Sequence, residues 1–217
     1  MGRPRAIVFD FNGTLSHDEP ILCEIFIELF AEHGKPLSAQ EYFDVLAGLS
    51  DPEIVRSWLG RDHPDVDDVI EERIRRYRAA VADGSSVPPE LREAVRFAAE
   101  RVPLAIVSGA ARPEIESVVE AAGLTDCFAA IVPAEDVELG KPAPDGYLRA
   151  HELLGQDLSP DDFLVFEDTE AGVESAKTAG MRCFAVLGTL SPERLAQADE
   201  IVERIDVPLM QRIFDES

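Results

Sequence analysis

The stretch IVFDFNGTLSHD, residues 7–18, leads from a wholly apolar run into an acidic turn that contains a glycine. Residues 6–9 are apolar without alternation, as in strands that are buried on both faces of a parallel sheet. Asp10 follows this run directly, and Gly13 supplies the turn. Because ligands of open α/β sheets lie beside the carboxyl ends of the strands, Asp10 is placed for ligand chemistry.

Four further apolar runs repeat this pattern along the chain. Helical patterns of crossover length separate the later runs, and each helical pattern ends at a glycine. This alternation predicts an α/β fold with a Rossmann-like, doubly wound parallel sheet. The further runs lie at residues 104–107, 128–132, 163–166 and 183–187, and the helical patterns at 113–122, 144–154 and 171–179.

The interval from residue 16 to residue 86 interrupts this rhythm, because it contains no convincing strand. Its apolar residues recur at helical spacing, and its capping residues divide it into four expected helices. We therefore predict a Rossmann-like core formed by residues 1–16 and 86–217. The residues between them, 17–85, are predicted to form an inserted four-helix cap domain.

The last two expected helices of this insert carry distinct terminal signals. Asp51 before Pro52 is a candidate N-cap of the third helix. The fourth helix has acidic residues in its first turn and arginines in its later turns, as the helix dipole favours. We interpret the arginine cluster as a solvated face and give little weight to a nucleic-acid patch. Its members are Arg73, Arg75, Arg76 and Arg78.

Linker chemistry marks the expected hinges of the insert. The stretch DGSSVPP at residues 83–89 combines glycine, serine and proline, which favour turns and loops. One hinge is expected there, near residues 84–88, and the other near Ser16. Motion of the insert about these hinges would open and close a site at the strand ends.

The acidic composition of the chain limits the kinds of molecule that it can bind. The 217 residues include 43 acidic and 20 basic side chains, for a formal net charge of -23. Such a chain repels polyanions, so we expect no binding to nucleic acid or to an anionic membrane surface. Dispersed cysteines favour reduced thiols, and no apolar run has the length of a membrane span. We therefore expect a cytoplasmic protein, and nothing in the sequence requires more than a monomer.

Polar side chains follow two more of the expected strands. Ser108 and Gly109 come after the second apolar run, and Glu167 and Asp168 come after the fourth. Taken singly, each could be a turn former or a helix cap. Because the carboxyl ends of neighbouring parallel strands meet at one edge of a sheet, their convergence with Asp10 favours a shared site.

Lys141 is one of only three lysines in the chain and lies in the segment ELGKPAPDGY, before an expected helix. A cation near a helix N-terminus is electrostatically unfavourable unless an anion is also present. A solvated loop lysine is the alternative interpretation. We expect Lys141 to lie beside the carboxylates or a bound anion.

These residues resemble the four motifs of the haloacid dehalogenase superfamily in order and spacing. The insert is similar to the four-helix cap of its β-phosphoglucomutase and phosphoglycolate phosphatase-like branch. The resemblance implies a Mg²⁺-dependent phosphohydrolase that acts on a small phosphorylated metabolite. The adjacent acids of the last motif favour phosphate chemistry over dehalogenation, which needs no metal. The matching motifs are DFNGTL at 10–15, Ser108, Lys141 and EDTEAG at 167–172.

The resemblance also implies a catalytic role for each motif. Asp10 would be the nucleophile that becomes an aspartyl phosphate. Ser108 and the Gly109 N–H group would bind phosphoryl oxygens, and Lys141 would neutralise charge on the nucleophile and the transferring group. Residue 12, here Asn12, would belong to the same catalytic set.

The implied metal site consists of oxygen ligands, which suit a hard cation such as Mg²⁺. The carboxylates of Asp10 and Asp168 and the backbone carbonyl of Asn12 would bind the ion directly, and Glu167 would bind through water. Substrate specificity would depend on side chains of the insert and of the loop after the second strand. The expected contacts are Ser50, Asp51, Arg56 and Arg112.

Asn12 departs from the pattern that this chain resembles. Family members that hydrolyse phosphate esters usually carry an aspartate there, which protonates the leaving group and then activates water. An amide cannot carry that proton, and general acid–base catalysis contributes about 10²–10⁴-fold. We therefore predict a slow phosphatase, or one that accumulates its phospho-aspartate.

Several alternatives follow from Asn12. His17 or Asp18 could supply the proton, or deamidation at the Asn12–Gly13 step could create an aspartate. The protein could instead be a phosphoester-binding protein or a phospho-aspartate sensor with little turnover. A sugar-phosphate mutase is less favoured, because Ser50 stands near the place where such mutases present an arginine.

Overall fold

The computed structural model describes residues 2–155 and 157–215. Its strands are β1 Ala6–Phe9, β2 Leu104–Val107, β3 Ala130–Val132, β4 Phe163–Glu167, β5 Arg182–Val186 and β6 Glu200–Val202. They form one parallel sheet in the order β3-β2-β1-β4-β5-β6. This order is that of a doubly wound fold, with the reversal of strand order between β1 and β4. The predicted fold class is therefore confirmed.

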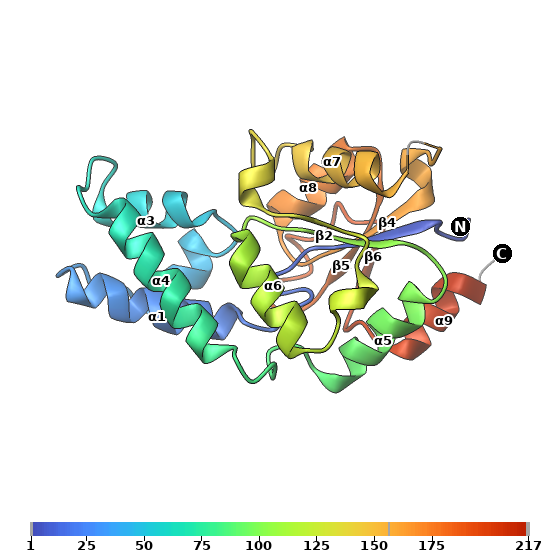
Figure 1. Ribbon diagram of the computed structural model, residues 1–217. Coiled ribbons are helices and arrows are strands. Elements are labelled where there is room, and N and C mark those ends of the chain that lie inside the picture. The colour runs from blue at the N-terminus through green and yellow to red at the C-terminus, as the bar shows by residue number, and fades with distance from the viewer. Residues whose placement is uncertain (1, 156, 216–217) are drawn as a thin grey trace.

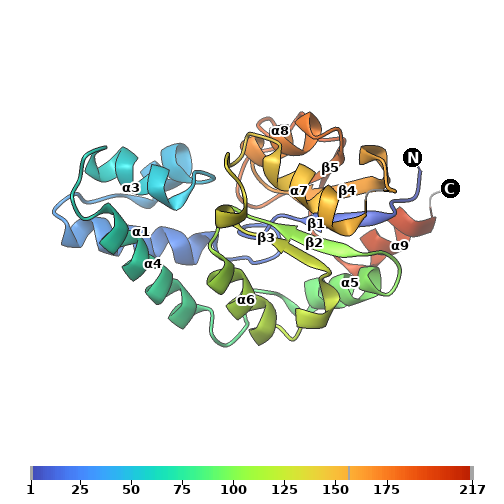
Figure 2. The same ribbon diagram turned by 45° about the horizontal axis from the view of Figure 1, so that its top comes forward.

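Helices cover both faces of the sheet (Figures 1 and 2). One face carries α7 and α8, and the other carries α5, α6 and α9. The helices of this part are α5 Pro89–Ala99, α6 Arg112–Ala121, α7 Asp145–Leu154, α8 Glu170–Thr178 and α9 Val207–Asp215. Short 3₁₀ turns lie at η2 Thr125–Cys127, η3 Ala134–Asp136 and η4 Pro160–Asp162.

Strand residues alternate between the two apolar cores on either side of the sheet. In β1, Ile7 and Phe9 pack with α5, α6 and α9, whereas Ala6 and Val8 pack with α7 and α8. All four side chains are fully buried. Both faces of the strand are covered, which explains why the sequence runs show no polar alternation.

The insert lies to one side of the sheet, on the left of Figure 1. Within residues 17–85 the described elements are α1 Glu19–Glu32, α2 Ala39–Glu41, a π-helical turn η1 Tyr42–Leu46, α3 Asp51–Leu59 and α4 Val66–Ala80. Buried residues of α1 and α4 belong to the same apolar cluster as α5 and α6. The division into a core and a cap domain stays a prediction, and residues 1, 156 and 216–217 of the predicted core lie outside the described residues.

Two predicted details differ in the structure. The N-cap of α3 is Ser50 and not Asp51, because the Ser50 backbone N–H donates to Glu53 at 3.0 Å in a capping box. The short strand β6 at the sheet edge was not predicted, since its three residues follow an acidic, loop-like stretch. Within the described residues, no helix combines the length and the apolar character that crossing a membrane requires.

The prediction of a solvated arginine cluster is wrong for Arg73. Its side chain is 3% exposed, and its guanidinium contacts Glu114 of α6 and, at 3.2 Å, Asp51 of α3. Arg73 lies on the buried stripe of α4, four residues after Val69 and four before Tyr77. The guanidinium therefore links two helices of the insert to the helix that follows β2.

We expect Arg73→Met to lower the free energy of unfolding by about 3–5 kcal/mol, because it leaves two buried carboxylates without their cation. Arg75→Met on the same helix is the matched control. Arg75 is 69% exposed and pairs with Glu72, so its loss should cost less than about 1 kcal/mol. Urea unfolding measures both, and equal losses would contradict the importance of the buried pair.

Candidate active site

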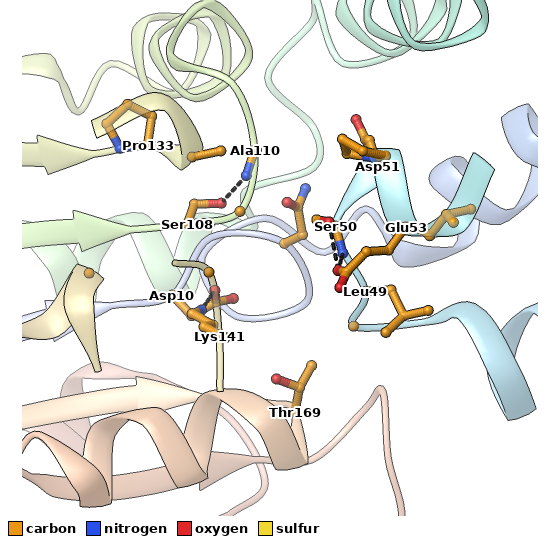
Figure 3. Close-up of a pocket in the computed structure, with 18 of the residues that line it drawn as sticks. Asp10, Leu49, Ser50, Asp51, Glu53, Ser108, Ala110, Pro133, Lys141 and Thr169 are labelled. Carbon is orange, nitrogen blue, oxygen red and sulfur yellow. Dashed lines mark hydrogen bonds and ion pairs between the residues drawn. The ribbon is translucent and has the colours of Figure 1, made fainter. Parts of the chain in front are cut away.

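A cavity of about 720 Å³ lies between the insert and the carboxyl ends of the strands (Figure 3). Figure 3 shows Asp10, Ser108 and Lys141 on the core side, with Ser50 and Asp51 opposite them on the insert. The structure thus brings residues distant in sequence to one space. The predicted site residues among its lining are Asp10, Asn12, Ser50, Asp51, Arg56, Ser108, Gly109 and Lys141.

Arg112 is the predicted substrate contact that the structure does not bring to the cavity. Its guanidinium donates to Asp136 at 2.7 Å and to the backbone carbonyl of Ile131 at 3.4 Å. The backbone N–H of Arg112 also donates to Glu135 at 3.0 Å. These contacts fix the start of α6 to the turn after β3, which is a structural role.

Asp10 and Lys141 form a buried ion pair at the end of β1. The Lys141 ammonium contacts the carboxylates of both Asp10 and Glu167. Burial raises the pKa of Asp10 to about 7, although the positive charge of Lys141 opposes this shift. Burial alone would lower the pKa of Lys141, but its two carboxylate partners outweigh burial and raise it. Lys141 therefore stays cationic, as its position in the sequence predicted.

Glu167 is held by donors from three parts of the chain. Oε1 accepts from Lys141 and, at 2.9 Å, from the Tyr147 hydroxyl, while Oε2 accepts from the backbone of Asp168 and from Thr169. A Cβ on Gly172 would lie 1.8 Å from Oε1, so only glycine leaves room for this carboxylate. The carboxylate is consequently fixed as the partner that orients Lys141.

Asp168 offers an oxygen that fits a metal ion. Thr14 donates to its Oδ1 at 3.0 Å, whereas its buried Oδ2 has no well-formed hydrogen bond within the described residues. Burial raises its pKa well above the usual range, followed by the charge of Asp10, while the Thr189 hydroxyl lowers it slightly. One carboxylate oxygen each of Asp10, Glu167 and Asp168 lies within 4.8 Å of the others. Three buried acids with one lysine favour a bound cation.

The Ser108 loop follows β2 directly and lies beside Asp10 on the core side of the cavity (Figure 3). Its hydroxyl oxygen accepts the backbone N–H of Ala110 at 2.9 Å, which leaves the hydroxyl hydrogen free to donate. The backbone N–H of Ser108 donates to Val132 at 3.0 Å and ties the loop to β3. A hydroxyl donor and the N–H groups of this loop suit the oxygens of an anion.

The structure separates the two alternative proton donors. His17 is exposed, and its backbone N–H donates to Ser86 at 2.7 Å, so the first predicted hinge contacts the second. Asp18 is fully buried behind Asn12 and is not among the residues that line the cavity. Asn12 Nδ2 donates to Asp18 Oδ2 at 3.0 Å. Neither side chain is placed beside Asp10 to protonate a leaving group.

The geometry of the Asn12–Gly13 step disfavours deamidation in the folded protein. Deamidation requires the backbone nitrogen of Gly13 to attack the Asn12 side chain. That N–H instead donates to the carbonyl of Ser16 at 2.7 Å, and it lies 3.4 Å from Asp18 Oδ1. The hydrogen bond therefore engages the N–H group that must lose its proton for deamidation to occur.

Sequence reasoning missed two buried charged residues that line the cavity. Glu19 begins α1, and its carboxylate accepts the Tyr42 hydroxyl at 3.2 Å. Burial, and then the charge of Asp18, raise the pKa of Glu19 to about 7. Arg73 is the other, and its helical spacing with Val69 and Tyr77 was the available signal. Glu19 had no comparable signal, since an acid at a helix start is ordinary.

Comparison with known proteins agrees with this geometry. The family described as haloacid dehalogenase-like hydrolase matches residues 7–186. The chain therefore belongs to that family and is a hydrolase, as the four motifs predicted.

Two curated relatives and one solved structure illustrate the likeness. The chain is 30% identical to validoxylamine A 7'-phosphate phosphatase of Streptomyces hygroscopicus subsp. limoneus, over 92% of this chain and 93% of the relative. It is 32% identical to protein CbbY of Rhodobacter capsulatus, over 90% and 88% of the two chains. The crystal structure of CbbY from Rhodobacter sphaeroides in complex with phosphate superposes with a TM-score of 0.82 at 26% identity, covering 93% and 95%.

We expect Glu19→Gln to become more stable relative to the native protein as the pH rises. The pKa of the Glu19 carboxyl is 4.5 in the unfolded chain and about 7 in the folded protein. Its contribution to folding stability is therefore fully present below pH 4.5 and is lost as the pH rises through about 7. Between about pH 4 and about pH 9 the difference should change by on the order of 3 kcal/mol.

Urea unfolding of both proteins at several pH values, with chelator present, measures this change. The exposed Glu120→Gln variant is the control, and its difference should not vary with pH. A pH-independent difference for Glu19→Gln would show that Glu19 ionises at its ordinary pKa in the folded protein.

Proposed function

We propose that this hydrolase is a Mg²⁺-dependent phosphatase that acts on a small phosphorylated metabolite through an aspartyl phosphate on Asp10. The observation that carries the proposal is the Asp10–Lys141 pair, which lies beside the Ser108 loop at the core side of the cavity. The names of relatives support phosphate-ester hydrolysis as the reaction class.

Asp10 serves as the nucleophile in the first half of the proposed reaction. Its carboxylate oxygen attacks phosphorus, and the bond between phosphorus and the ester oxygen breaks. The departing oxygen keeps the electron pair and takes a proton from solvent or a nearby donor. Ser108 and the Gly109 N–H group hold the phosphoryl oxygens, while Lys141 offsets their negative charge.

Water completes the reaction in the second half. It attacks phosphorus, and the bond from phosphorus to Asp10 breaks. Phosphate leaves, and solvent takes up the proton that the attacking water loses. Asn12 lines the cavity and offers an amide that can orient a water but cannot take its proton. This step is therefore the one that Asn12 slows, and general acid–base catalysis sets the loss at about 10²–10⁴-fold.

The metal site that we propose comprises the carboxylates of Asp10 and Asp168, the backbone carbonyl of Asn12, and Glu167 through water. The acids lie close together, and Asp168 Oδ2 is available as a ligand. When bound, Mg²⁺ supplies positive charge that offsets the buried carboxylates and the phosphoryl oxygens.

Residues 17–85 act as a cap in this proposal. They supply one wall of the cavity, so their closure would exclude water from the reacting groups. The buried contact of Arg73 with Glu114 joins the insert to the core in the closed arrangement. Opening the cap would break that contact and expose both charges to solvent.

A compact monophosphate is the substrate class that the cavity supports. Ser50, Asp51 and Arg56 line it on the insert side as the proposed contacts for the leaving group. Arg73 is already compensated by two carboxylates, so it offers little to a second phosphate. This arrangement gives a mutase less support than a phosphatase.

We expect the protein to hydrolyse an aryl phosphate slowly with Mg²⁺, and Asp10→Asn to reduce the rate to background, because the amide is not a nucleophile. Chelation should abolish activity, and added Mg²⁺ should restore it. The exposed Asp44→Asn variant is the control and should keep the native rate.

Measured phosphate release distinguishes the alternatives. Activity of Asp10→Asn equal to the native rate would rule out Asp10 as the nucleophile. Mg²⁺-dependent binding of phosphate without turnover of any phosphoester would favour the binding or sensor alternative.

A further inference from the structure

The half-buried amide of Asn12 and the buried carboxylate of Asp18 form a hydrogen-bonded pair beside the catalytic aspartate. The Asn12 amide donates from Nδ2 to Asp18 Oδ2 at 3.0 Å. The same carboxylate accepts the Tyr77 hydroxyl and, at 3.4 Å, the backbone N–H of Gly13. Asp18 is 0% exposed, and its hydrogen-bond partners within the described residues are all neutral donors.

The chemistry of the two groups fixes the orientation of the amide. A carboxylate accepts hydrogen bonds, so the NH₂ group of Asn12 must face Asp18. The amide oxygen then points away from Asp18. Since Asn12 also lines the cavity, its Oδ1 is the atom available to a water or a leaving-group hydroxyl.

An aspartate at position 12 would not keep this contact. Replacing Nδ2 by a carboxylate oxygen turns an N–H to O hydrogen bond of 3.0 Å into a contact between two acceptors. Tyr77 and Gly13 already donate to Asp18 and have no further hydrogen to share. The two facing oxygens then have no donor between them, which costs either the lost hydrogen bond or the uptake of a proton.

We propose that Asp18 is a positioning residue for position 12, and that the two positions form an exchangeable pair in which one side chain must be an amide. Asp18 makes asparagine the residue that fits at position 12. The carboxylate that a faster phosphatase uses there would fit only when position 18 carries the amide. The activity part of this inference rests on the proposed phosphatase function, whereas the pairing does not.

Four proteins test the pairing: the native chain, Asn12→Asp, Asp18→Asn, and the double variant with the groups exchanged. We expect each single variant to lower the Tm by about 4–8 °C, because each loses the donor–acceptor match. The double variant restores the match between positions 12 and 18 with the polarity reversed, and the Tyr77 hydroxyl, which shares Asp18 Oδ2 with Asn12, then accepts a hydrogen bond instead of donating one. Its Tm should return to within about 2 °C of the native value.

Turnover of an aryl phosphate with Mg²⁺ gives the second measurement. We expect Asn12→Asp alone to have a kcat well below that of the double variant, because its carboxylate is not held toward the cavity. The double variant should gain about 10²-fold or more in kcat, since a held carboxylate can move the proton. A merely structural role for Asp18 would restore the Tm without this gain.

The exposed pair of Gln40 and Asp44 provides a matched control. Gln40 Nε2 donates to Asp44 Oδ2 at 2.8 Å, which is the same chemistry in solvent. Gln40→Glu, Asp44→Asn and their combination should shift the Tm additively within about 2 °C. Water satisfies the unmatched groups there, so exchange brings no rescue.

Each outcome bears on the inference. Additive Tm shifts for positions 12 and 18 would overturn the pairing, and a gain for Asn12→Asp equal to that of the double variant would overturn the positioning role. If Asn12→Asp does not fold, a folded double variant supports the pairing and an unfolded one overturns it. Rescue of the Tm without hydrolysis by any of the four proteins would confirm the pairing and contradict the phosphatase proposal.

Discussion

The contact of the Lys141 ammonium with Asp10 and Glu167 is the interaction on which the site depends. It joins the ends of two neighbouring strands, β1 and β4, to the loop that precedes α7. Buried carboxylates at adjacent strand ends repel one another, and a single lysine cannot compensate three of them. The acidic surplus at this edge would therefore also favour the binding of a cation.

A second cation, Arg73, also contacts two carboxylates, where the insert meets the helix that follows β2. Arg73 lies between Asp51 and Glu114, as Lys141 lies between Asp10 and Glu167. The chain carries a net charge of -23, and it places these two cations where carboxylates from separate elements converge. Each of these two basic residues thus joins two acids from separate elements.

The sequence was sufficient to predict five of the six described strands and the core side of the site, for a physical reason. Neighbouring parallel strands end at one edge, so Asp10, Ser108 and Asp168 had to converge once the strands were assigned. The insert side was less predictable, because docking of helices decides which side chains become buried. Arg73 was read as solvated from its arginine neighbours, although its spacing with Val69 and Tyr77 indicated the buried stripe.

Asn12 shows why a motif residue should be interpreted together with its contacts. Considered alone, an amide in place of an acid indicates a damaged catalytic site. In the structure it is the complement of Asp18, whose buried carboxylate accepts three donors and would meet an unmatched acceptor if residue 12 were an aspartate. This turn therefore still contains a carboxylate, but it belongs to Asp18, which is buried behind Asn12 and does not line the cavity.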